Sequence, residues 1–175
     1  MALVFLLGGA RSGKSALAVR LAERSGLPVT FVATAEARDE EMAERIARHR
    51  AVRPAGWTTI EEPVDLMGAL DRVPAGSCLV LDCLSLWVSN LLERGDDAIE
   101  RQAEEAAARV AAREPLGIAV SNEVGLGVVP VTGLGRRYRD ALGRVNAIWA
   151  EAASEASLVV AGCLVPLARP GSLDG

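Results

Sequence analysis

The residues best suited to chemistry form the segment Gly8-Gly9-Ala10-Arg11-Ser12-Gly13-Lys14-Ser15, which fits the P-loop pattern G-x-x-x-x-G-K-[ST]. Lys14 is the one lysine among the 19 lysine and arginine residues of the chain. A phosphate cradle needs a compact ammonium on a flexible stem, because a planar guanidinium does not fit under the β- and γ-phosphates of a nucleotide. We therefore predict that this segment binds a nucleoside triphosphate.

The neighbours of this segment support the prediction. An apolar run at 3–7 precedes it and indicates a strand, and a helix-like stretch at 12–24 follows. A helix that begins at the loop directs its N-terminus and free backbone N–H groups toward bound phosphates. The alternative, a glycine-rich turn with an incidental lysine, does not require this context.

A second candidate is Asp82, which ends the apolar run Leu79-Val80-Leu81. P-loop proteins hold Mg²⁺ with such an acid and with the hydroxyl that follows the lysine. We therefore predict a Mg²⁺ site at Asp82 and Ser15. The alternative for Asp82 is a solvated or helix-capping aspartate.

His49 is the only histidine, and arginines surround it at positions 45, 48, 50 and 53. Met42, Ile46 and His49 have the spacing of one helix face. One interpretation is a solvated helix with a stray histidine, which the spacing alone favours. The other is that the arginines bind phosphate, while a neutral imidazole attacks a phosphorus atom. The pattern leaves both open.

The segment 122–130 follows a strand-like run and is rich in glycine and apolar residues. It has the character of a ligand loop or a mobile lid, and a simple connector fits almost as well. Glu123 is its only carboxylate, so it is a candidate for orienting an acceptor hydroxyl.

Composition excludes several classes of function. The net charge of −4 does not indicate nucleic-acid binding. A regulatory GTPase is disfavoured, because a chain whose only lysine is Lys14 has no Asn-Lys-x-Asp guanine motif. Cys78, Cys83 and Cys163 are expected to be buried free thiols. The first apolar run is too short for a membrane span, so we expect a cytoplasmic protein without one.

Apolar runs that alternate with helical patterns predict an α/β chain: a P-loop NTPase-type three-layer fold with a mostly parallel central sheet. One domain is expected over 1–168, followed by a frayed tail at 169–175. Pro63 is expected to start a helix. The expected strands are 2–7, 29–33, 58–60, 78–82, 117–121, 157–161 and 163–167, and the expected helices are 13–24, 38–50, 63–72, 97–113 and 136–156.

Ligands of such a sheet bind beyond the carboxyl ends of its strands. The residues that follow the expected strands are therefore candidates for the site. Besides the P-loop they are Thr34-Ala35, Asp82-Cys83, 121–125 and Gly162-Cys163.

With these residues in view, the chain resembles the adenosylcobinamide kinase/adenosylcobinamide-phosphate guanylyltransferase family. The resemblance runs in order from residue 3 to about 162. Its specific parts are the histidine segment and the Asn-Glu-Val-Gly loop. The matching segments are Gly8 to Ser15, Ala33-Thr34-Ala35, Arg45-Ile46 with His49-Arg50 and Arg53-Pro54, Trp57, Leu81 to Leu84, Ser89 to Leu92, Asn122 to Pro130, Arg139-Asp140 and Gly143 to Asn146.

The resemblance implies an enzyme of cobalamin assembly. It would phosphorylate adenosylcobinamide with ATP or GTP, and then transfer GMP from GTP to adenosylcobinamide phosphate, through a guanylylated histidine that corresponds to His49. It also implies a homotrimer. The implied nucleotide contacts are Gly8, Gly9, Ala10, Arg11, Ser12, Gly13, Lys14, Ser15, Ala33, Thr34, Ala35, Arg50, Ala51, Val52, Arg53, Glu61 and Asp82.

Two rival functions stay open at this point. One is a small-molecule P-loop kinase without guanylyl transfer, and the other is a GTP-dependent switch module. The sequence also departs from the family in one respect, since the tail beyond Pro166 is longer than expected.

Overall fold

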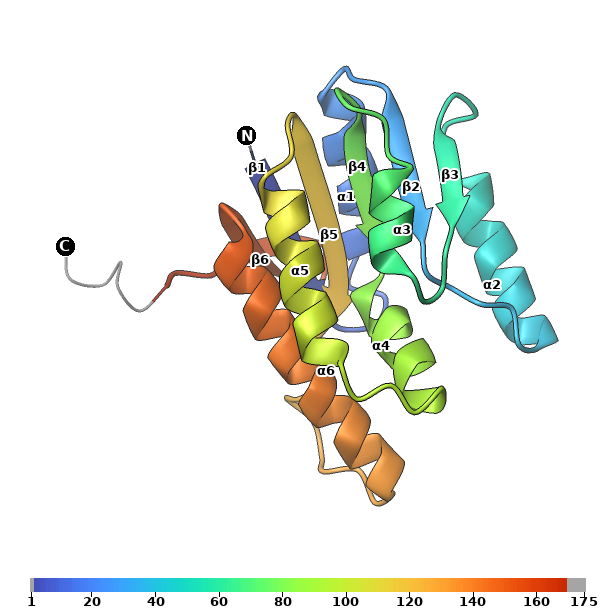
Figure 1. Cartoon of the computed structure of the whole chain (residues 1–175), viewed down its shortest axis with the longest axis vertical. Helices are drawn as coiled ribbons and strands as arrows, with labels where there is room; N and C mark the ends of the chain where they lie inside the picture. Colours follow the sequence, from blue (N-terminus) through green and yellow to red (C-terminus); the bar gives the residue numbers. More distant parts are fainter. Residues whose placement is uncertain (1, 170–175) are drawn as a thin grey trace.

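The computed structural model describes residues 2–169, and one seven-stranded sheet runs through them in the order β3-β2-β4-β5-β1-β6-β7 (Figure 1). All neighbouring strands are parallel except β6 and β7. Every expected strand is confirmed, including both short ones. The strands are β1 Ala2–Gly8, β2 Val29–Ala33, β3 Thr58–Glu61, β4 Cys78–Asp82, β5 Leu116–Asn122, β6 Glu155–Val160 and β7 Cys163–Pro166.

Helices cover both faces of the sheet, which confirms the predicted three-layer α/β fold. The helix α1 (Lys14–Arg24) packs on one face through Ala18 and Ala22. The other face is covered by α3 (Leu66–Asp71), α4 (Leu84–Glu93), α5 (Ile99–Ala111) and α6 (Gly133–Ala152). The remaining helix, α2 (Glu40–Ala51), lies beside β3 in Figure 1 and contributes no buried residue.

The helix α6 keeps the face that its spacing predicts. Leu142, Val145 and Trp149 are fully buried and Tyr138 packs against the same core. The helix begins three residues before the expected 136, because the hydroxyl of Thr132 caps it by accepting from the Gly135 N–H at 3.1 Å. It ends before the expected 156, because β6 begins at Glu155.

Two helix predictions were wrong. Pro63 does not start α3; the helix begins at Leu66, because the carboxylate of Asp65 caps it through the Gly68 N–H at 2.9 Å. The helix α4 was not expected at all. Six of its ten residues are buried, so its sequence lacks the wide polar face by which a surface helix is recognised.

The cysteine prediction was wrong for one residue. Cys78 and Cys83 are buried, whereas Cys163 is exposed, because it lies on the edge strand β7, all of whose residues are exposed. Of the predicted tail, 170–175 lie outside the described residues, and Arg169 donates to the Glu151 carbonyl at 2.6 Å. No helix within 2–169 is both long enough and apolar enough to cross a membrane.

Candidate active site

The P-loop leaves the carboxyl end of β1 and turns tightly into α1. Arg11 and Gly13 have positive φ angles of 56° and 97°, and the Ser12 N–H donates to the Gly9 carbonyl at 3.3 Å. Gly8 has no room for a side chain, since a Cβ would lie 2.5 Å from the Val159 carbonyl oxygen. The first turn of α1 therefore opens onto the loop, which is the arrangement that binds phosphate.

Lys14, the first residue of α1, is 8% exposed. Its Nζ donates to the Gly9 carbonyl at 2.9 Å. Burial lowers the pKa of Lys14 below its ordinary value, and the nearby Asp82 carboxylate opposes this shift. A buried ammonium with one protein hydrogen bond keeps donor capacity for an anionic ligand.

The parallel register gathers functional residues at the carboxyl edge of the sheet. Glu61 of β3 lies beside Ala33 of β2, and Ala33 lies beside Asp82 of β4. On the next strands, Asn122 of β5 lies beside Gly8 of β1. These five positions come from distant parts of the chain, so the sheet order alone brings the P-loop and Asp82 into one site.

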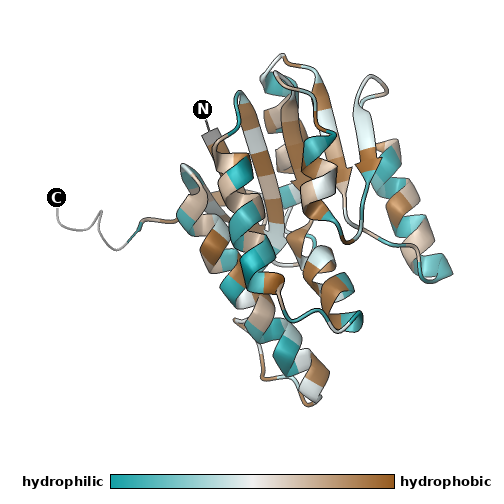
Figure 2. Cartoon of the chain, viewed as in Figure 1, coloured by the Kyte–Doolittle hydropathy of each residue, from teal (hydrophilic) through white to brown (hydrophobic). Residues whose placement is uncertain are grey.

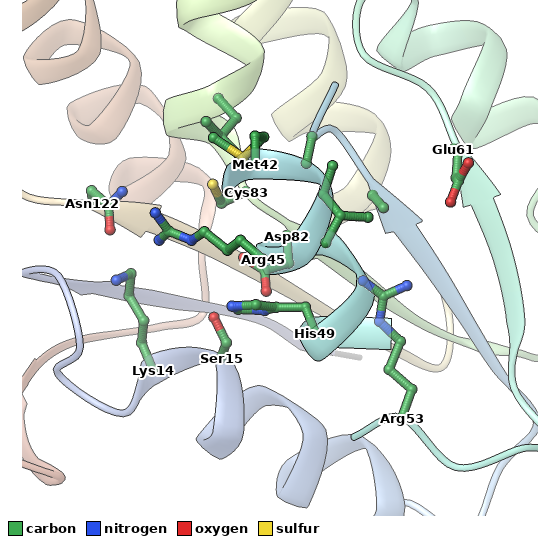
Figure 3. Close-up of a pocket in the computed structure, with 14 residues that line it drawn as sticks. Lys14, Ser15, Met42, Arg45, His49, Arg53, Glu61, Asp82, Cys83 and Asn122 are labelled. Carbon is green, nitrogen blue, oxygen red and sulfur yellow. The ribbon is translucent and has the colours of Figure 1, made fainter. Parts of the chain in front are cut away.

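Asp82 and Ser15 line the same pocket as Lys14 (Figure 3). Within residues 2–169 the Asp82 carboxylate accepts no hydrogen bond and the Ser15 hydroxyl has no hydrogen-bond partner. The backbone of Asp82 is fixed, because its carbonyl accepts from the Thr34 N–H at 3.3 Å. The two oxygens are thus placed and available, as the ligands of a hard cation need to be.

The helix α2 covers the open side of the pocket. Its residues Met42, Arg45, Ile46 and His49 all line the cavity, so the predicted helix face is the one that points inward. In Figure 3, Arg45 and His49 reach from α2 toward Lys14 and Ser15. His49 forms no hydrogen bond within the described residues, so the imidazole has no protein partner there.

The C-terminal end of α2 is joined to the sheet by its arginines. Arg50 forms an ion pair with Glu61. The guanidinium of Arg53 lies 3.7 Å from the centre of the Phe31 ring. Trp57 also stacks on Phe31, with 6.4 Å between the two ring centroids. These contacts place Arg53 and Glu61 on the side of the pocket opposite Lys14 (Figure 3).

The structure brings eight of the sequence-predicted site residues into the pocket lining: Lys14, Ser15, Ala33, Ala35, His49, Arg53, Glu61 and Asp82. The other predicted residues lie outside that lining. Among them, Val52 is 71% exposed, and Thr34 is buried with its hydroxyl donating to the Cys83 carbonyl at 2.6 Å.

Sequence reasoning gave no role to three residues of the lining. Cys83 and Asn122 belong to the predicted strand ends, but Leu86 lies on α4, the helix that was not expected. Burial raises the pKa of Cys83 to about 11, so its thiol stays protonated near neutral pH. Glu123, the candidate for orienting an acceptor, is not in the lining, and its carboxylate accepts from the Gly125 N–H.

Known proteins resemble this chain over almost its whole length. The chain is 50% identical to the bifunctional adenosylcobalamin biosynthesis protein CobP of Pseudomonas aeruginosa over 93% of this chain and 95% of that protein. It is 39% identical to the bifunctional adenosylcobalamin biosynthesis protein CobU of Salmonella typhimurium, over 91% and 96%. A type III secretion ATPase superposes with a TM-score of 0.52 and 11% identity, covering 90% of this chain and 50% of that one; this likeness concerns the fold alone.

The family model of cobinamide kinase / cobinamide phosphate guanyltransferase matches residues 4–167, almost the whole described chain. The match covers the P-loop, the histidine helix and the strand ends that meet in the pocket. This protein therefore belongs to the cobinamide kinase / cobinamide phosphate guanyltransferase family.

Proposed function

We propose that this protein phosphorylates adenosylcobinamide with ATP or GTP and then transfers GMP from GTP to the product, with His49 as the covalent carrier. One observation carries the role of His49: the only histidine of the chain lines the same pocket as Lys14 and Ser15 of the P-loop. The name of the Pseudomonas relative, a bifunctional adenosylcobalamin biosynthesis protein, supports the two reactions.

In the kinase step the protein mainly positions the reactants and stabilises charge. The P-loop N–H groups and Lys14 hold the β- and γ-phosphates, so negative charge that develops on them meets a buried ammonium. The acceptor hydroxyl oxygen forms a bond to the γ-phosphorus while the bond from that phosphorus to the bridging oxygen breaks; the nucleoside diphosphate leaves and the hydroxyl proton passes to solvent. Little covalent chemistry is required of the side chains.

In the guanylyl step an imidazole nitrogen of His49 forms a bond to the α-phosphorus of GTP. The bond from that phosphorus to the bridging oxygen breaks, and pyrophosphate leaves. Arg45 lies on the His49 face of α2 and neutralises this leaving group together with Lys14. An oxygen of the corrinoid phosphate then forms a bond to the same phosphorus, the bond from that phosphorus to the imidazole nitrogen breaks, and His49 is regenerated.

The residues present fit Mg²⁺ at Asp82 and Ser15, because a carboxylate and a hydroxyl without protein partners lie together in the pocket. The ion would reduce the charge of the phosphates. We further propose that the nucleoside lies along Ala33, Ala35, Arg53 and Glu61, which line the far side of the pocket. The family resemblance supports a homotrimer acting in the cytoplasm.

Labelled GTP tests the role of His49. GTP labelled at the α-phosphate should tag the parent protein, GTP labelled at the γ-phosphate should not, and the tag should be lost in acid and kept in alkali. His49→Asn should abolish the tag and retain kinase activity. Arg48→Gln is the matched control, because Arg48 lies on the same helix with a 67% exposed side chain, and this variant should be tagged normally.

Product analysis with adenosylcobinamide, Mg²⁺ and GTP separates the alternatives. The parent should form adenosyl-GDP-cobinamide. Accumulation of adenosylcobinamide phosphate without a tag would identify a simple kinase. Bound GTP that is not consumed would identify a switch module. An untagged parent that forms the GDP product at full rate would remove His49 from the mechanism.

A further inference from the structure

Exposed large apolar side chains gather on the segment that joins β5 to α6. We call Leu126, Val128, Val129, Val131 and Leu134 the apolar strip. All are more than half exposed, and Val128 reaches 95%. In Figure 2 this connection is drawn largely in brown where it returns to the start of α6. Grouped apolar side chains in water mark a surface that binds something.

The strip follows the active-site pocket in the chain, four residues after Asn122. Asn122, the last residue of β5, lines the pocket, and the next residue, Glu123, donates its N–H to the Gly8 carbonyl of the P-loop at 3.1 Å. The connection that carries the strip therefore leaves the sheet beside the P-loop.

Polar contacts hold the backbone of the second half of the strip, at residues 130–132. Arg136 donates to the carbonyl oxygens of Pro130 and Val131 at 3.0 and 2.8 Å, and Thr132 caps α6. Because these contacts satisfy backbone groups internally, the outer surface of the strip is left to its apolar side chains. A preformed apolar surface costs little ordering when it binds a ligand.

The proposed reactions determine which ligand approaches from this side. The acceptor must bring its hydroxyl to the phosphates, and the side formed by Ala33, Arg53 and Glu61 is taken by the nucleoside in the proposed function. Asn122 lines the pocket on the side away from Arg53 and Glu61 (Figure 3). An adenosylcobinamide acceptor carries a broad corrin macrocycle with apolar faces and an amide rim, and only its side-chain hydroxyl needs to enter the pocket.

We infer that the apolar strip binds the corrin macrocycle of the acceptor and that Asn122 receives its reactive hydroxyl; this rests on the proposed function. The Nδ2 of Asn122 donates to the Ser85 hydroxyl at 2.9 Å, which leaves its Oδ1 to accept from the acceptor hydroxyl. The backbone carbonyl of Asn122 accepts from Asn146 at 3.0 Å. The residue is thus held from two directions.

A second copy of the chain is the competing occupant, and another surface suits it better. Val160, Leu164, Val165 and Leu167 are 40–52% exposed and lie on or next to the hairpin of β6 and β7. β7 ends the sheet, and an edge strand offers unpaired backbone groups to another chain. In the sheet, β1 lies between this hairpin and β5, whose carboxyl end leads to the strip.

The test replaces two strip residues with serine, in the double variant Val128→Ser with Val131→Ser. The KM for adenosylcobinamide should rise about tenfold or more, from the lost apolar contact. The KM for GTP and the extent of His49 labelling by GTP should not change. The control, Glu104→Ser with Glu105→Ser at two exposed positions of α5, should leave the corrinoid KM unchanged.

An unchanged corrinoid KM would overturn the inference. Dissociation of the oligomer in sedimentation would then assign the strip to a second copy. An equal rise in the GTP KM would overturn it too. If the double variant loses its circular dichroism, Val128→Ser alone decides. Failure of the proposed function would be seen separately, because the parent would form no adenosyl-GDP-cobinamide. In that case equilibrium dialysis, which measures binding of the coloured corrinoid to parent and variant, tests the strip directly.

Discussion

Two helices flank the active-site pocket, and they are attached to the protein in different ways. The helix α4 buries six of its ten residues, among them Trp87 and Leu91. The helix α2 buries none of its twelve residues. Lys14 and Asp82, which we propose hold phosphate and cation, belong to α1 and β4; these two elements and α4 all bury residues, and we call them the packed side. His49 is instead carried by a helix that can change position without opening the core.

Polar contacts hold the two ends of α2. Before the helix, Arg38 forms ion pairs with Glu36 and Glu93 and donates to the Oδ1 of Asn90 at 2.8 Å. At the C-terminal end, Arg50 pairs with Glu61, and Arg53 just after the helix lies over the Phe31 ring. Exposed ion pairs of this kind contribute little stability, about 0–1 kcal/mol each. When Arg45 is attracted to a polyphosphate, moving the helix therefore costs little free energy.

The largest effect is expected at the centre of the packed side. Lys14→Ala should lower both the kinase and the guanylyl transfer rate by about 100-fold or more, because both need the same grip on the phosphates. Arg20→Ala, an exposed change on the same helix α1, should leave both rates unchanged. Full kinase turnover by the Lys14 variant would show that the two reactions do not share the P-loop.

A smaller effect is expected for the cation. Asp82→Asn keeps the shape of the side chain and removes its charge, so higher Mg²⁺ concentrations should be needed for half-maximal rate in both reactions. Thermal unfolding should stay close to that of the parent, since the Asp82 carboxylate makes no hydrogen bond within 2–169. Superimposable Mg²⁺ titrations of variant and parent would exclude Asp82 as the cation ligand.

Much of the packed side could be predicted from the sequence. The central strands β2, β4 and β5 are apolar runs buried on both faces, and the P-loop pattern fixes where β1 ends and α1 begins. The helix α4 could not be predicted, because Leu84, Trp87 and Leu91 with their apolar neighbours leave no polar stripe to show its period. The start of α3 was missed because Pro63 is an equally good residue for an extended lead-in.

The site residues were predicted mainly from the chemistry of their side chains and less from hydrophobic periodicity. Lys14 and Asp82 follow from the P-loop, and the face formed by Met42, Ile46 and His49 follows from helical spacing. That this face turns toward the P-loop depends on the path of the chain between β2 and β3, which no local pattern encodes. The apolar strip was seen only as a ligand loop, lid or connector, because exposure is a property of the fold.

Substitutions of apolar residues in α6 and α2 compare how much each helix contributes to the free energy of unfolding. Leu142→Ala removes a fully buried side chain from α6 and should lower the free energy of unfolding by about 2–5 kcal/mol. Ile46→Ala on the half-buried face of α2 should cost less than about 1 kcal/mol, since that face borders the pocket rather than the core. Equal losses in urea unfolding would show that α2 is part of the cooperative core.

Limited trypsin digestion tests the same difference without any substitution. Cleavage of a helix requires local opening, and opening is easiest where few side chains are buried. The first cuts should therefore follow Arg45 or Arg48 in α2, whereas Arg144 in α6 is protected by the buried residues around it. Saturating GTP should slow the α2 cuts severalfold in the parent and should have no effect in Lys14→Ala. Mass spectrometry of the early fragments distinguishes these sites, and a first cut after Arg144 would mean that α2 is not the loosely attached helix.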